Sequence, residues 1–242
     1  MRQPAHPPSD DTSSPRADRP RRTVSVARML EIDAAAIKTF GIPRLLLMEH
    51  AGLALAHVAT SMCPAPGRTI LVCCGTGFNG GDGLAAARHL QTWGYPLRLL
   101  LTGWADQLRE EPAVYARMLQ RLGVGVMEVT SPSAVAQVEP WMTECALIID
   151  ALLGIGIRGV VREPSASLIE RINRSGRPVL AADIPSGLDG DVGLPQGVAV
   201  RATKTVAFGL AKQGCVSGEG PAYIGELLVE PIGIPPQLLE SV

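Results

Sequence analysis

Aromatic side chains are scarce in this chain of 242 residues, since Phe, Trp and Tyr together make up 4% of it. A surface that stacks the bases of single-stranded nucleic acid needs such rings, so their scarcity counts against that function. Basic and acidic residues nearly cancel, at 22 and 23, which leaves a net charge of -1. Binding to nucleic acid or to a membrane by charge alone is therefore not expected.

Cysteine is also sparse. The five Cys residues are odd in number and none has C-x-x-C spacing, so neither a zinc site nor a disulfide framework is expected, and a reducing compartment is favoured. No apolar run approaches the ~18 residues of a transmembrane helix, and the N-terminus has no apolar secretory segment. We therefore expect no membrane association and a cytoplasmic location.

Two parts of the chain differ in composition. Residues 1–22 contain five Pro, five Arg and three Asp and no aromatic residue. Such a segment cannot bury enough apolar surface to fold, so we predict a disordered tail. Residues 23–242 show no internal repeat and no long linker, and they are predicted to form one domain.

Short apolar runs alternate with helical patterns along this domain. Strands are predicted at 69–74, 97–101, 125–129, 146–150, 178–183, 204–208 and 226–229. Helices are predicted at 26–39, 44–60, 81–93, 112–122 and 167–173. Continuous apolar strands that alternate with helices indicate a mainly parallel sheet covered on both faces. The predicted class is α/β, with a Rossmann-like, doubly wound sheet.

Three segments rich in Gly and Asp follow predicted strands, at residues 75–83, 150–159 and 183–189. The carboxyl ends of parallel strands meet at one edge of the sheet, where ligands bind in this class of fold. We therefore expect the three segments to form one site.

The first segment contains G-x-G-x-x-G at Gly75, Gly77 and Gly80. Glycines between a strand and a helix let the backbone approach a phosphate. The acid that would bind a ribose after the next strand is missing, and no Lys-Ser/Thr pair marks a P-loop. The alternative is a tight turn in which Asp82 complements the helix dipole.

The other two segments each place an Asp at the end of an apolar strand. Asp150 would point into the ligand crevice or, alternatively, cap the turn that follows. Asp183 is a candidate general acid/base, whereas Ser186 lacks the G-x-S-x-G context of a serine hydrolase. Asn79, Asp150 and Ser186 offer only oxygen ligands, which suit a hard cation of low charge better than zinc or copper.

Four stretches resemble the NAD(P)H-hydrate epimerase family, also called the YjeF N-terminal domain: residues 47–52, 75–84, 150–156 and 183–189. The resemblance runs from about residue 24 to residue 235. It implies a Rossmann-like homodimer that interconverts the R and S hydrates of reduced nicotinamide cofactors, NADHX and NADPHX. It also implies that a separate NAD(P)H-hydrate dehydratase consumes the S form.

The resemblance further implies roles for individual residues. Asp183 would help the C6 hydroxyl of the substrate to leave and return. Potassium would be held by Asn79, Asp150 and Ser186. The implied substrate-binding residues are Phe78, Asn79, Gly80, Gly81, Asp82, Gly154, Ile155, Gly156, Ile157, Arg158, Gly159, Val160 and Asp183.

Two positions depart from the family pattern: Phe78 stands where the family usually has Asn, and Thr76 stands where Pro is common. A phenyl ring makes none of the hydrogen bonds of an amide, but it can narrow a pocket or stack on a base or a nicotinamide. Two hypotheses follow: an active epimerase, or a non-catalytic member that binds a nucleotide-like metabolite or a partner protein. A conventional NAD(P) dehydrogenase is less consistent with the missing ribose-binding acid.

Overall fold

The structure is a computed structural model that describes residues 22–65 and 67–240. All of the predicted tail except Arg22 therefore lies outside the described residues. The main sheet has seven parallel strands in the order β4-β3-β2-β5-β6-β7-β9. Its strands are β2 (Ile70–Cys74), β3 (Leu97–Leu101), β4 (Val126–Glu128), β5 (Leu147–Ala151), β6 (Val179–Ala182), β7 (Lys204–Phe208) and β9 (Glu226–Glu230). A second, two-stranded sheet pairs β1 (Thr23–Val24) with β8 (Ala211–Lys212).

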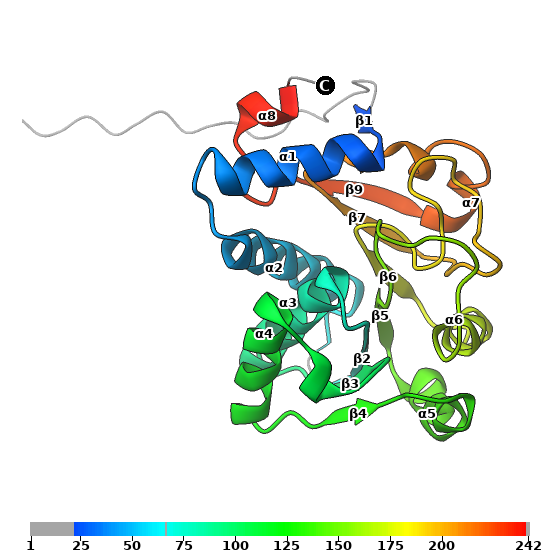
Figure 1. Cartoon of the computed structure of the whole chain (residues 1–242). Coiled ribbons are helices and arrows are strands. Elements are labelled where there is room, and N and C mark those ends of the chain that lie inside the picture. Colours follow the sequence, from blue (N-terminus) through cyan, green and yellow to red (C-terminus); the bar gives the residue numbers. More distant parts are fainter. Residues whose placement is uncertain (1–21, 66, 241–242) are drawn as a thin grey trace, which may run out of the picture.

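Helices cover both faces of the main sheet, which confirms the predicted class (Figure 1). The longer helices are α1 (Val26–Lys38), α2 (Arg44–Met62), α3 (Phe78–Thr92), α4 (Glu110–Arg121), α5 (Pro132–Glu144) and α6 (Ser165–Arg174). The short ones are η1 (Ala105–Gln107), η2 (Gln213–Cys215), α7 (Pro221–Ile224) and α8 (Pro236–Glu240). Helices α2, α3 and α4 lie on one face, and α5 and α6 lie on the other.

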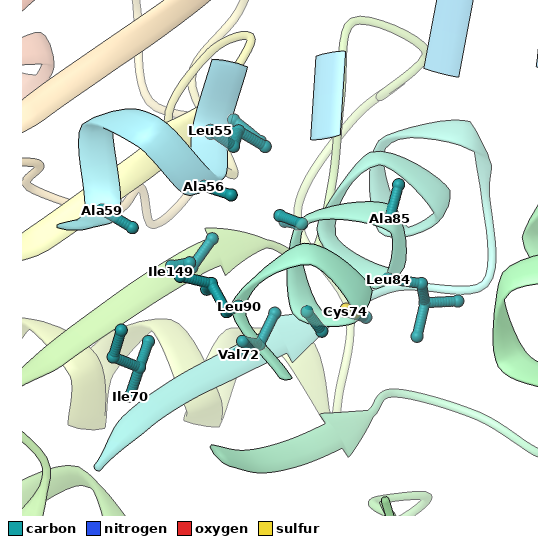
Figure 2. Close-up of a cluster of buried hydrophobic side chains, with 14 of the residues drawn as sticks. Leu55, Ala56, Ala59, Ile70, Val72, Cys74, Leu84, Ala85, Leu90 and Ile149 are labelled. Carbon is teal, nitrogen blue, oxygen red and sulfur yellow. The ribbon is translucent and has the colours of Figure 1, made fainter. Parts of the chain in front are cut away.

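The central strand β2 shows why the strands read as continuous apolar runs. Ile70, Val72 and Cys74 pack into the layer of α2 and α3, while Leu71 and Cys73 pack into the layer of α5 and α6. All five side chains are fully buried. Figure 2 shows the first layer, in which side chains of α2 and α3 rest on β2 and β5. A strand buried on both faces needs apolar residues at every position.

Helix α2 is long and apolar enough to cross a membrane by length and composition alone. In this structure it is a core helix that packs closely on α3. A Cβ added at Gly52 would lie 2.4 Å from the Cβ of Ala85, so only glycine permits this approach. Met48, Ala51, Leu55, Ala56 and Ala59 are the buried apolar side chains through which α2 joins the core on this face of the sheet.

Helix α3 begins at Phe78, three residues before the helix predicted at 81–93. Most of the glycine segment is therefore the first turn of a helix. Gly77 is the N-cap, and a Cβ at Gly80 would lie 1.8 Å from the carbonyl oxygen of Gly75. Close packing of the helix on the end of β2 explains the glycine at position 80.

Helix α5 was not predicted from the sequence, because Pro132 and Pro140 indicate breaks. Pro132 instead occupies the start of the helix, where its missing N–H costs nothing. The hydroxyl of Ser131 caps the helix by accepting from the N–H of Ala134 at 3.3 Å. Burial of an apolar stripe on the sheet offsets the interior proline.

The strand order creates a crevice at one place. Helix α3, which follows β2, lies on one face of the sheet, while α6, which follows the neighbouring strand β5, lies on the other. The connections therefore diverge beyond the carboxyl ends of β2 and β5, where ligands bind in such folds. The three segments singled out from the sequence follow β2, β5 and β6.

Candidate functional site

A cavity of about 630 Å³ opens at this edge of the sheet. Its walls come from the segments after β2, β5 and β6, from the first turn of α3, and from one face of α1. The volume lies within the range of small-molecule and cofactor sites. Its charged lining residues are Asp33, Arg44, Asp82, Asp183 and Lys212.

Below the cavity, a cluster of oxygen atoms joins all three segments. Asp150 is fully buried, and its carboxylate accepts hydrogen bonds from the hydroxyl of Ser186 at 2.6 Å and from the backbone N–H of Ser186 at 2.8 Å. The hydroxyl of Ser186 also accepts from the N–H of Leu153 at 2.8 Å. Asn79 reaches the cluster from α3 and donates from Nδ2 to the carbonyl oxygen of Leu153 at 2.9 Å.

Two features of this cluster bear on what it can bind. Burial raises the pKa of Asp150 to about 6, although the hydrogen bonds from Ser186 and Leu152 oppose that shift. The Oδ1 atom of Asn79 is buried and has no hydrogen-bond partner in the described part of the chain. A buried acceptor without a donor is costly, and a cation would satisfy it. The side chains of Asn79, Asp150 and Ser186 present only oxygen atoms as metal ligands, a donor type that suits a hard cation.

Asp183 lies at the cavity wall directly after β6, in a left-handed backbone conformation with φ of +65°. Its Oδ1 atom accepts from the N–H of Phe208 at 3.0 Å and forms an ion pair with Nζ of Lys212. Lys212 is 1% exposed and also donates to the carbonyl oxygen of Phe208 at 3.0 Å. Oδ2 of Asp183 has no protein partner among the described residues, so it is the oxygen left for a ligand.

Two further carboxyl groups face the same cavity. Burial raises the pKa of Asp33, on α1, to about 6; Asp183 adds to the shift, while Lys212 and Arg44 oppose it. Burial also holds the pKa of Asp82 well above its usual range, and both Asp183 and Asp33 add to that effect. The cavity therefore holds carboxyl groups that take up protons closer to neutral pH than an ordinary Asp.

Phe78 does not close the cavity. The residue is 48% exposed at the cavity wall, and the guanidinium of Arg44 lies 4.5 Å from the ring centre. Arg44 also approaches Glu110 at 3.3 Å. The ring and the guanidinium together form a flat, positively charged surface beside the opening.

The structure separates the predicted site residues into groups. Cavity-lining residues are Phe78, Asn79, Gly80, Asp82, Gly154, Ile155, Gly156, Ile157 and Asp183. Asp150 and Ser186 lie beneath them in the buried oxygen cluster. Gly81, Arg158, Gly159 and Val160 do not line this cavity.

Sequence reasoning did not assign Asp33 or Lys212 to the site. Asp33 precedes the predicted strands and lies within an otherwise ordinary helical pattern. Lys212 is one of three lysines in the chain and follows a predicted strand. The scarcity of lysine is the one signal that could have drawn attention to it.

Comparisons with known proteins identify the family of the chain. The family described as YjeF-related protein N-terminus matches residues 44–214. A bifunctional NAD(P)H-hydrate repair enzyme of Pyrobaculum aerophilum is 47% identical over 199 residues, which cover 81% of this chain and 39% of that protein. The chain thus spans about two fifths of that bifunctional relative.

Two other relatives match over most of their own length. An NAD(P)H-hydrate epimerase of Limosilactobacillus fermentum is 36% identical over 208 residues, covering 86% of this chain and 95% of that protein. The crystal structure of the yeast protein YNL200c has a TM-score of 0.72 at 25% identity, covering 81% of this chain and 83% of that one.

Proposed function

The chain belongs to the family of YjeF-related protein N-termini, and from that premise we propose that it is an NAD(P)H-hydrate epimerase. Its substrates would be the C6-hydrated cofactors NADHX and NADPHX, interconverted between R and S forms. The observation that carries this proposal is the position of Asp183, held by Lys212 and Phe208 with one carboxylate oxygen left for a ligand.

The reaction requires the hydroxyl at C6 to leave and to return on the other face of the ring. The lone pair on the ring nitrogen stabilises the cation formed when the hydroxyl leaves as water. Oδ2 of Asp183 would exchange a proton with that hydroxyl, because it is the carboxylate oxygen without a protein partner. Lys212 and the N–H of Phe208 hold the carboxylate in one orientation.

We propose that Asn79, Asp150 and Ser186 hold a potassium ion. The unpartnered Oδ1 of Asn79 supports this assignment, as do the oxygen atoms of Ser186 and Asp150 that lie in the same cluster. When bound, the ion would supply positive charge close to the first turn of α3. The protein's own role there is to orient Asn79 through its hydrogen bond to Leu153.

The diphosphate of the substrate would bind at the N-terminus of α3 and along the segment at 154–160. Backbone N–H groups in the first turn of a helix are free to bind anions, and the glycines of this turn leave them accessible. Gly154, Ile155, Gly156 and Ile157 already line the cavity, whereas Arg158, Gly159 and Val160 would have to approach the ligand.

Two partner assignments belong to the same proposal. The S hydrate would pass to an NAD(P)H-hydrate dehydratase, as the names of the bifunctional relatives suggest. The protein would act as a homodimer. A cytoplasmic location stays a prediction from the sequence.

The proposal is tested by measuring conversion of R to S hydrate with purified protein, with and without potassium. An S-specific dehydratase reports consumption of the R form above the spontaneous rate. We expect acceleration with both substrates, and a further increase with potassium that Asn79→Ala reduces. Folded protein that gives no acceleration would contradict the epimerase assignment.

The second candidate is a non-catalytic member that binds a nucleotide-like metabolite or a partner protein. Phe78 is the observation that favours it, because it replaces the usual amide at the cavity wall. Calorimetric binding of NADP+ without any catalysis of epimerisation would support this candidate.

A further inference from the structure

One face of α1 forms a wall of the cavity. Met29, Leu30, Asp33, Ala34 and Ile37 all line it, and their spacing places them on a single side of the helix. Asp33 is the only polar side chain in this set. Packing alone would favour another apolar residue at that position.

The carboxyl group of Asp33 has no hydrogen bond or ion pair with protein in the described part of the chain. It lines the same cavity as Lys212 and Asp183, and their charges act on its pKa in opposite directions, since Lys212 lowers it and Asp183 raises it. An unpartnered carboxyl group in an apolar wall costs stability. Such groups are typical of functional sites.

Asp33 and Asp183 come from different walls. Asp183 follows β6 at the edge of the sheet, whereas Asp33 projects from α1, which lies outside the stretch matched by the family, 44–214. A flat ring bound between helix and sheet edge would present one face to each carboxyl group. In this epimerisation the hydroxyl leaves from one face of the ring and water adds to the other face, so a proton-transfer group on each face would assist both steps.

We propose that Asp33 is a second catalytic acid/base, acting on the ring face opposite Asp183. This inference rests on the proposed epimerase function. In one direction, Asp33 gives its proton to the C6 hydroxyl, and the C–O bond breaks with both electrons leaving on water. The ring nitrogen lone pair forms the N1=C6 bond. A water molecule then adds to C6 from the other face and loses its proton to Oδ2 of Asp183.

The reverse direction uses the same groups with their roles exchanged. Asp183 then protonates the hydroxyl and Asp33 accepts the proton of the incoming water. Both directions need one proton shared between the two carboxyl groups, so activity falls when both groups lose their protons. The pKa of Asp33, raised by burial to about 6, places that loss near neutral pH. The charged groups facing it are Asp183, Lys212, Arg44 and Asp82.

The test compares Asp33→Asn with the wild-type protein, using the R-to-S assay over pH 5–8. We expect kcat to fall about 100-fold, the lower end for loss of a general acid or base. KM and the binding of NADP+ should change little. In the wild type, kcat/KM should fall above about pH 6, and Asp33→Asn should remove that dependence.

Glu31→Gln is the matched control, because it makes the same chemical change on the exposed side of α1. It should leave both kcat and the pH profile unchanged. A thermal melt of each variant shows that it is folded.

Three results would overturn the inference while wild-type epimerisation stays intact: normal kcat in Asp33→Asn, reduced kcat with the pH dependence retained, or a wild-type profile that is flat over this range. The inference would also be overturned if Asp82→Asn, and not Asp33→Asn, removed the dependence of kcat/KM on pH. Wild-type protein without any epimerase activity would instead remove the proposed function on which the inference rests.

Discussion

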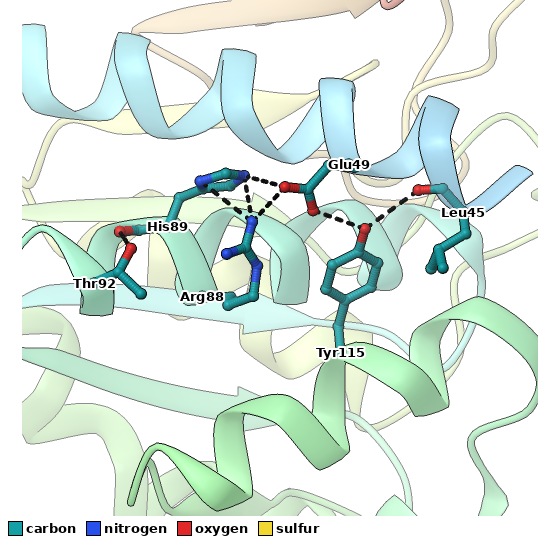
Figure 3. A network of polar contacts seen from close by, with 6 residues as sticks. All are labelled: Leu45, Glu49, Arg88, His89, Thr92 and Tyr115. Carbon is teal, nitrogen blue, oxygen red and sulfur yellow. Dashed lines mark hydrogen bonds and ion pairs between the residues drawn. The ribbon is translucent and has the colours of Figure 1, made fainter.

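Two groups of charged side chains in this protein differ in how completely they are paired. The first group joins α2, α3 and α4 (Figure 3). Glu49 accepts through Oε1 from Arg88 and lies 3.0 Å from Nε2 of His89, and through Oε2 it accepts from the hydroxyl of Tyr115 at 2.9 Å. Each charge in this group has a partner on another helix or a neighbouring residue.

The second group lines the cavity and is incompletely paired. Asp183 has one partner charge, Lys212, whereas Asp33 and Asp82 have no hydrogen-bonding or ion-pair partner in the described part of the chain. The pKa of both Asp33 and Asp82 is raised as a result of their burial. Paired charges hold the helices together, while unpaired carboxyl groups keep the capacity to bind ligands and move protons.

The largest expected effect is a loss of activity, and it comes from a substitution in the group that lines the cavity. Asp183→Asn keeps the shape of the side chain and its Oδ1 acceptor but removes the group that exchanges a proton. We expect epimerisation to slow about 1,000-fold, with NADP+ binding largely retained. The coupled assay and calorimetry measure the two quantities. A variant with normal activity would show that the cavity carboxylate is structural, like Glu49.

The next effect concerns stability. Glu49→Ala leaves Arg88, His89 and Tyr115 without their shared partner. The free energy of unfolding should fall by roughly 2–3 kcal/mol, since part of the network is buried. Activity per folded molecule should stay unchanged, because none of these residues lines the cavity. Urea titration measures the free energy of unfolding. If the folded variant lost most of its activity, the distinction between the two groups would be wrong.

Asp33→Asn should have the opposite effect on stability from Glu49→Ala. The pKa of Asp33 is about 6 in the folded protein and 3.8 for the ordinary group, so the folded state binds the proton more tightly. The wild type therefore loses stability as pH rises from about 4 through 6. We expect Asp33→Asn to raise the free energy of unfolding by about 1–2 kcal/mol at pH 7 and by almost nothing near pH 4. Melts at the two pH values test this, and destabilisation at pH 7 would contradict it.

The smallest effect concerns the cavity opening. Phe78→Asn restores the usual family residue and removes the ring stacked on Arg44. If the ring stacks on the substrate, KM should rise about fivefold, which is ~1 kcal/mol, with little change in kcat. Steady-state kinetics distinguishes this from the alternative, in which the ring obstructs the substrate and the substitution raises kcat/KM.

The sequence predicted most of the sheet correctly. The strands at 97–101 and 204–208 have the predicted bounds, because each is a run bordered by turn-forming residues. The hydroxyl of Ser25 caps α1 by accepting from the N–H of Arg28 at 3.2 Å. Errors occurred where local signals and packing disagree, at the start of α3 and at the prolines of α5.

Part of the site could also be predicted. Asp150, Asp183 and the glycine segment stood out because each follows an apolar strand, and the carboxyl ends of parallel strands share one edge. The pairing of Asp183 with Lys212, 29 residues later, could not be predicted in this way. Nothing in the local sequence marks either residue as the partner of the other.

The sequence by itself determined the alternation of strands and helices and the residues that follow each strand, because backbone geometry and side-chain burial impose periods that extend over a few residues. Only the tertiary structure decided that α1 forms a wall of the cavity and that Asp33, Asp82, Asp183 and Lys212 share one space. Electrostatic effects depend on burial and on distance between groups. Both are set by packing of segments that lie far apart in the chain.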